Sequence, residues 1–155
     1  MSMQICVLSD RRLTFISEWQ QAVDAESFPL RLSFGKPLAQ IGGFISAHIG
    51  KTPTGFECRY RMPGDISAAY PEINFGHAWK YGMAFIWGGD INELQAAWAA
   101  AAAYAQATEG IVFDEQEGKL LSPEEAIQTF RDLARTIPDV DAVVRNLMEQ
   151  IRAKH

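Results

Sequence analysis

The sequence predicts an α+β fold in which helices pack on one face of a mainly antiparallel sheet. One observation is a block of strand-like segments between residues 42 and 62, joined by a turn rather than by a helix. A second is the order of the remaining patterns, which neither alternate regularly between strand and helix nor consist of strands alone. The chain has 155 residues, 48% of them hydrophobic, so residues 1–155 are expected to form a single domain with its own core.

The first segments are expected to be a strand, a helix and a second strand. Residues 3–8 are apolar and are followed by the turn formers Ser9 and Asp10. Apolar residues then recur at helical spacing over residues 14–25, with Thr14 as the predicted N-cap. Residues 30–34 alternate between apolar and polar side chains, which is typical of a half-buried strand.

The middle of the chain is expected to extend the sheet. Residues 42–48 and 55–62 have strand character and are separated by the turn-forming residues 50–53, which favours an antiparallel pair. Residues 63–76 are irregular, with one predicted helical turn around residues 66–70. Residues 81–87 are β-branched and aromatic and predict another strand.

Gly88 and Gly89 connect that strand to an alanine-rich, amphipathic helix. Asp90 is its predicted N-cap, and Gly110 its predicted stop. A strand-to-helix turn with glycines binds phosphate when its backbone N–H groups are free. Here Asp90 is expected to occupy those donors, and neither the dinucleotide-binding pattern nor the P-loop pattern is present. The turn is therefore predicted to be scaffold.

The C-terminal part predicts a hairpin and two helices. Residues 111–113 and 119–121 flank an acidic turn that places Gly118 in the left-handed conformation. A calcium loop is the rejected alternative, because Lys119 stands where that loop requires glycine. Ser122 and Glu125 form a capping box that opens one helix, and a last helix is predicted to start near residue 138.

Charge and cysteine content indicate the compartment and the partners. The net charge is −5, and the residues after Lys80 include 12 acidic and 6 basic side chains. An acidic surface repels phosphate backbones and attracts basic proteins, so we expect a protein partner and no nucleic acid. Cys6 and Cys58 are predicted to be buried, reduced thiols. With no signal-peptide pattern and no stretch long enough to span a bilayer, the protein is expected to be cytoplasmic, with no membrane association.

No catalytic, metal-binding or cofactor motif is present. His48, His77 and His155 are isolated, and the sequence contains neither a zinc-ligand spacing nor a nucleophile elbow. We therefore predict no catalytic residue, no bound metal and no cofactor. The alternative is a small ligand-binding domain or an enzyme in which His77 acts as an acid or base beside Glu57 or Glu72 in a cleft.

The residues around 70–81 and the acidic hairpin are the candidate binding segments. Residues 70–81 mix aromatic and acidic side chains, a composition found at protein-binding hot spots. The alternative is that these aromatic rings plug the core, and that the acidic residues only cap helices or face water. The candidate partner-binding residues are Tyr70, Glu72, His77, Trp79, Asp114, Glu115 and Glu117.

The segments TGFEC (residues 54–58), WGGD (87–90) and GIVFD (110–114) resemble a group of small bacterial proteins of uncharacterised function. That group combines a strand of this type, an alanine-rich helix and a G-[IV]-V-[FY]-D hairpin, and the resemblance extends to about Ser122. In size, charge and architecture such proteins are similar to immunity proteins that neutralise bacterial toxins. The resemblance implies an immunity-type inhibitor, with a basic toxin as one candidate partner, and leaves the oligomeric state open. A module that dimerises through an edge strand or the last helix is a further alternative.

Overall fold

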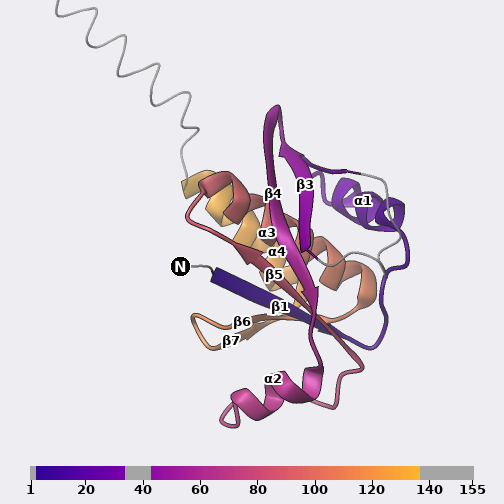
Figure 1. Ribbon diagram of the computed structural model, residues 1–155, viewed down its shortest axis with the longest axis vertical. Coiled ribbons are helices and arrows are strands. Elements are labelled where there is room, and N and C mark those ends of the chain that lie inside the picture. The colour runs from indigo at the N-terminus through magenta and orange to yellow at the C-terminus, as the bar shows by residue number, and fades with distance from the viewer. Residues whose placement is uncertain (1–2, 34–42, 137–155) are drawn as a thin grey trace, which may run out of the picture.

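A seven-stranded sheet, antiparallel at every pairing, forms the middle of the protein (Figure 1). The computed structural model describes residues 3–33 and 43–136. The strand order is β2-β3-β4-β5-β1-β6-β7. The strands are β1 (Met3–Ser9), β2 (Leu30–Leu32), β3 (Gly43–Ile49), β4 (Thr52–Tyr60), β5 (Tyr81–Trp87), β6 (Ile111–Asp114) and β7 (Lys119–Leu121). The predicted α+β class is confirmed.

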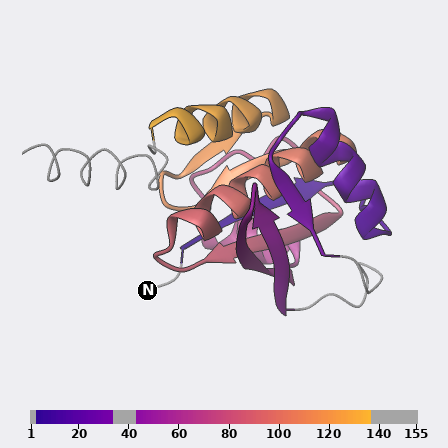
Figure 2. The same cartoon turned by 90° about the horizontal axis from the view of Figure 1, so that it is seen from above.

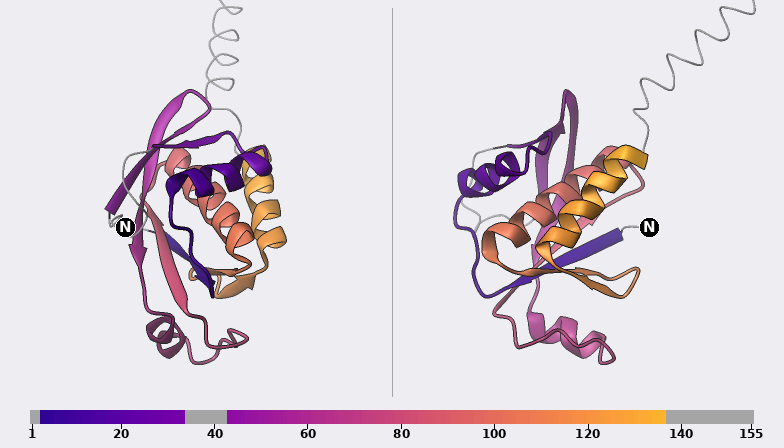
Figure 3. Two further views of the ribbon diagram at one scale, coloured as in Figure 1. Left: turned by 90° about the vertical axis from the view of Figure 1, so that its right-hand side faces the viewer. Right: turned by 180° about the vertical axis from the view of Figure 1, so that it is seen from behind.

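Of the four helices in the described residues, three cover one face of this sheet, as Figures 2 and 3 show: α1 (Ile16–Ala25), α3 (Ile91–Thr108) and α4 (Pro123–Thr136). The fourth, α2 (Pro63–Ala69), lies on the opposite face, because Ile66 packs there with Cys6 and Leu8. The expectation that helices pack on one face therefore holds for the three long helices. No helix in residues 3–33 or 43–136 is long and apolar enough to cross a membrane.

Helix α3 lies between the sheet on one side and α1 and α4 on the other. Every residue from Ala96 to Ala105 is buried, so the helix is not amphipathic as predicted but enclosed on all sides. Its ten consecutive buried positions include eight alanines, whose small side chains let neighbouring backbones approach closely. The indole N–H of Trp19, from α1, donates a hydrogen bond of 2.9 Å to the Ala100 carbonyl.

The two ends of α3 are set by Asp90 and Gly110. Asp90 Oδ1 accepts hydrogen bonds from the N–H groups of Asn92 (2.7 Å) and Glu93 (3.1 Å), so the predicted N-cap is confirmed. At the other end Glu109, with φ of 56°, takes the left-handed conformation. Gly110 is required for a different reason, since a Cβ there would lie 2.3 Å from the Leu8 carbonyl oxygen.

Several boundaries differ from the predictions, and three of these differences have a local cause. Helix α1 starts at Ile16 with Phe15 in the N-cap position, because Glu18 accepts the N–H groups of both Thr14 and Phe15, each at 3.1 Å. The turn between β3 and β4 is shorter than expected, so β4 begins at Thr52. Helix α2 extends over two turns rather than one, since proline at position 63 favours a helix start.

The C-terminal hairpin and the start of α4 agree with the predictions. Gly118 has φ of +63° between β6 and β7. Ser122 and Glu125 form both hydrogen bonds of a capping box, at 3.0 and 3.1 Å. The predicted last helix, from about residue 138, lies outside the described residues.

Candidate functional site

A second, smaller core lies on the face of the sheet that carries α2. It consists of Cys6, Leu8, Ile66, Phe75, Ala84 and Phe113. The rings of Tyr70 and Phe75 both meet the Phe113 ring edge-on, with centroid distances of 4.8 and 5.1 Å. The loop after α2 is thereby held against the sheet beside the β6–β7 hairpin (Figure 3).

Glu115, directly after β6, joins the strands and the loop at the rim of this second core. Its Oε2 atom accepts hydrogen bonds from Gln4 Nε2 (2.7 Å) and from the Tyr70 hydroxyl (3.4 Å). Its Oε1 atom accepts from Arg61 Nη1, in an ion pair, and from the Cys6 thiol (3.3 Å). We call these five residues the Glu115 junction. It connects β1, the segment after β4, the end of α2 and the hairpin.

The junction fixes the ionisation of its members. Partial burial alone would raise the pKa of Glu115, but the hydrogen bonds from Gln4, Arg61 and Cys6 together outweigh it and lower that pKa. Burial, together with the negative charge of Glu115, raises the pKa of Cys6 to about 12. The Cys6 thiol is therefore protonated at neutral pH, and a protonated thiol is a poor nucleophile.

The second thiol, Cys58, lies in the main core on β4, and burial raises its pKa as well. Both cysteines are free and buried, as predicted. Within residues 3–33 and 43–136, no group of three or more His, Cys, Asp and Glu side chains is placed to hold a metal ion.

His77 belongs to a separate group at the other end of the loop. Its Nε2 atom lies 2.8 Å from Asp10 Oδ2, and its ring stacks on Trp79 with a centroid distance of 3.9 Å. Asp10 Oδ1 also accepts a hydrogen bond of 3.2 Å from the Lys80 N–H. The Trp79 indole N–H donates to the Phe75 carbonyl at 2.8 Å, so Trp79 faces inward while His77 remains exposed.

Tyr70, Phe75 and Trp79 of the 70–81 segment therefore take the core-plugging alternative, whereas Tyr81 is exposed. Phe75 is buried, and Tyr70 and Trp79 pack against the second core. The exposed candidate residues are Glu72, His77 and Glu117.

The structure joins the predicted binding residues in two pairs, Tyr70 with Glu115 and His77 with Trp79. Asp114 has a structural role, because its Oδ1 atom accepts the N–H groups of Gln116 and Glu117 in the hairpin turn.

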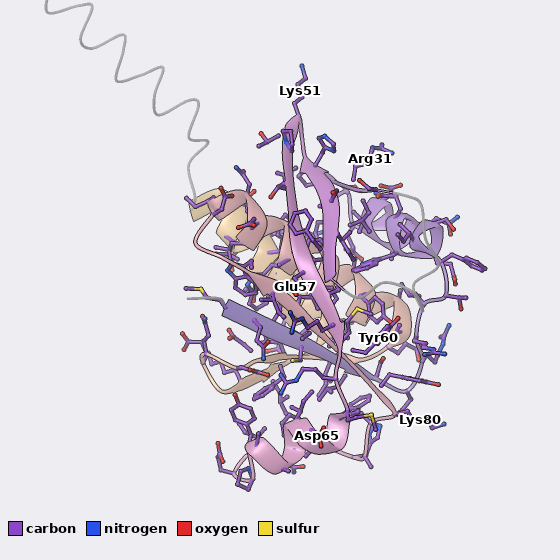
Figure 4. The ribbon with its side chains drawn as sticks, in the orientation of Figure 1. Arg31, Lys51, Glu57, Tyr60, Asp65 and Lys80 are labelled. Atoms are coloured by element: carbon purple, nitrogen blue, oxygen red, sulfur yellow. The ribbon has the colours of Figure 1, made fainter. Side chains whose placement is uncertain are left out.

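The alternative cleft of Glu57, Glu72 and His77 receives no support from the described part of the chain. Glu57 lies in the middle of β4 and forms an ion pair of 2.6 Å with Arg59 (Figure 4). His77 pairs instead with Asp10, and no hydrogen bond or ion pair between described residues connects the three side chains.

Sequence reasoning missed three members of the junction: Gln4, Cys6 and Arg61. Gln4 and Cys6 lie 111 and 109 positions from Glu115, so no local pattern connects them with it. Gln4 could have indicated a polar contact on this face, because it is a polar residue on the same strand face as Cys6 in an otherwise apolar segment.

No protein-family model, no curated protein and no solved structure matches the chain. The resemblance to small bacterial proteins, and through them to immunity proteins, accordingly stays a prediction.

Proposed function

We propose that the chain is a cytoplasmic binding protein that recognises a basic protein partner through the end of the molecule where the hairpin turn meets the end of α2. The observation that carries the proposal is the contact between Tyr70 and Glu115, which holds two segments 45 positions apart side by side. Figures 1 and 3 show the hairpin turn next to the end of α2.

Two exposed carboxylates flank this contact. Glu72 follows Tyr70 by two residues, Glu117 follows Glu115 by two residues, and both side chains are exposed. We call Glu72 and Glu117 the acidic pair. Because the Glu115 junction fixes the segments that carry it, a partner would order little additional chain on binding, and this lowers the entropic cost of association. The negative charges of the acidic pair would also speed the approach of a basic partner.

An immunity-type inhibitor fits this arrangement, with a basic toxin as the partner. Such an inhibitor needs a stable acidic surface and no catalytic group, which agrees with a protonated Cys6 and a Glu115 already occupied by four donors. This identification rests on the resemblance in size, charge and architecture.

The test is affinity capture from the native host with the purified protein, at low and at high ionic strength. We expect one stoichiometric partner whose affinity falls with salt and falls about tenfold in Glu72→Lys and in Glu117→Lys, since each reversal replaces an attraction with a repulsion. Glu124→Lys makes the same change at an exposed position of α4, which lies on the opposite face of the sheet from α2. This variant should leave affinity within about twofold.

Two results would contradict the proposal. One is the absence of any stoichiometric partner at low salt. The other is an equal loss of affinity in all three variants, which would indicate a general charge effect. For the immunity-type role, co-expression with the product of a neighbouring gene must relieve that product's toxicity.

A further inference from the structure

A recess opens beside the end of β4 and the start of β5. Figure 4 labels two residues of its lining, Tyr60 and Lys80, on the opposite side of the view from the hairpin turn. The recess has a volume of about 290 Å³, close to the lower limit for small-molecule sites. It is lined by Arg12, Tyr60, Arg61, Met62, Pro63, Lys80, Tyr81 and Gly82.

The lining contains three cationic side chains and no acidic one, although the protein as a whole carries a charge of −5. Arg61 is neutralised by Glu115 in the junction. Arg12 and Lys80 have no ion-pair partner within the described residues. Two positive charges therefore face the same recess, where they favour an anion.

The same recess has flat, apolar walls. Tyr60, Tyr81 and Met62 are 39%, 36% and 69% exposed, which is unusually high for side chains of this size. The Arg12 guanidinium lies over the Tyr81 ring, 5.2 Å from its centroid, in a cation–π contact. An aromatic ring and a cation are thus presented together, within reach of a single ligand.

The backbone around the recess is fixed before any ligand arrives. The Arg61 N–H donates to the Gly82 carbonyl at 2.9 Å, and a Cβ at Gly82 would lie 2.5 Å from the Arg61 carbonyl oxygen. The Lys80 N–H is held by Asp10. A preorganised lining reduces the ordering cost of binding.

We propose that this recess binds a small organic anion that combines a carboxylate or phosphate group with a flat unsaturated ring. Arg12 and Lys80 contact the anionic group, and Tyr81 with Tyr60 contacts the ring. The site is distinct from the acidic pair of the proposed protein interface, and it takes a ligand of opposite charge.

Phenyl phosphate and benzoate are suitable probes, and binding can be followed by the backbone amide shifts of the ¹⁵N-labelled protein. We expect saturable binding of at least one probe, with the largest shifts at residues 12, 60–62 and 80–82. Arg12→Gln and Lys80→Gln should each weaken binding about tenfold, because each removes a charged contact.

Matched variants separate the two halves of the site. Lys51→Gln removes a positive charge from the β3–β4 turn, at the far tip of the molecule in Figure 4, and should change affinity less than about twofold. Tyr81→Leu should weaken phenyl phosphate several-fold more than inorganic phosphate, because only the former has a ring to stack. Unchanged thermal unfolding of each variant shows that the fold is intact.

The proposal is overturned by any of three results: no saturable shifts with either probe, an equal loss of affinity in Lys51→Gln and Lys80→Gln, or equally tight binding of the uncharged analogue benzyl alcohol. If Tyr81→Leu weakens both phosphates equally, the ring contact is wrong.

Discussion

At the scale of single residues, Glu115 connects four segments of the chain at the rim of the second core. Its carboxylate has four hydrogen-bond donors, from Gln4, Cys6, Arg61 and Tyr70, and its side chain is only 13% exposed. Hydrogen bonds to a charged acceptor contribute more than neutral ones, and removing the charge leaves Arg61 without its ion-pair partner.

Glu115→Gln is therefore expected to lower the free energy of unfolding by about 1–3 kcal/mol. Urea-induced unfolding at pH 7 measures this difference. Glu117→Gln, two residues away and exposed, is the matched control and should change stability by less than about 0.5 kcal/mol. Equal effects of the two substitutions would show that the junction does not stabilise the fold.

The effect of Glu115 should also depend on pH. Its pKa is lower in the folded protein than in the unfolded chain, so its contribution is present above the unfolded pKa and is lost as pH falls through the folded pKa. The stability difference between wild type and Glu115→Gln should thus be larger at pH 7 than at pH 3, as measured by urea unfolding at both values. A difference that grows towards acid pH would contradict the lowered pKa.

At the scale of elements, the close approach of the α3–β6 connection to β1 depends on one glycine. A Cβ at Gly110 would lie 2.3 Å from the Leu8 carbonyl oxygen, a backbone atom that cannot rotate away. Gly110→Ala is expected to destabilise the protein by about 1–3 kcal/mol, in urea or thermal unfolding. Gly89→Ala, where the added Cβ meets no atom within 4 Å, should have an effect below about 1 kcal/mol. If Gly110→Ala were as stable as the wild type, β1 and the start of β6 would be able to move apart at little cost.

The elements that the sequence predicted well are those whose signals are local. Asp90, Gly118 and the Ser122–Glu125 box act within four residues of themselves, and all three take the predicted roles. The predicted amphipathic character of α3 was wrong, because burial on all sides depends on α1 and α4, which are remote in the sequence.

In the candidate site, too, local composition could be interpreted from the sequence, whereas contacts between remote segments could not. Glu115 and Tyr70 were selected for their composition, as possible contacts for a partner, and the structure makes them partners of one another. Gln4, Cys6 and Arg61 could not be associated with them in advance, because their proximity is produced by the register of β1 with β6 and by the course of the chain after β4.

At the scale of the whole molecule, the two faces of the sheet differ in depth of packing. The first face carries the large core around Trp19 and the buried helix α3, whereas the second carries the small core under the seven-residue helix α2. Subglobal opening is expected where fewer apolar groups are buried.

Native-state hydrogen exchange should therefore find the slowest amides in α3, with opening free energies equal to that of global unfolding. The amides of α2 should exchange at least about tenfold faster, through an opening that detaches α2 and leaves α3 closed. Equal protection of the two helices would show that both faces open in one step.

The position of β1 between β5 and β6 has a consequence for biosynthesis. Met3 pairs with Trp87 and Leu8 with Ile111, so β1 is synthesised well before both of its neighbours and is enclosed only when the later one, β6, has also emerged. At about 5–20 residues per second, the apolar side chains of Ile5, Val7 and Leu8 wait many seconds without their partners. During translation this strand therefore exposes apolar surface of the kind that favours aggregation until the sheet closes around it.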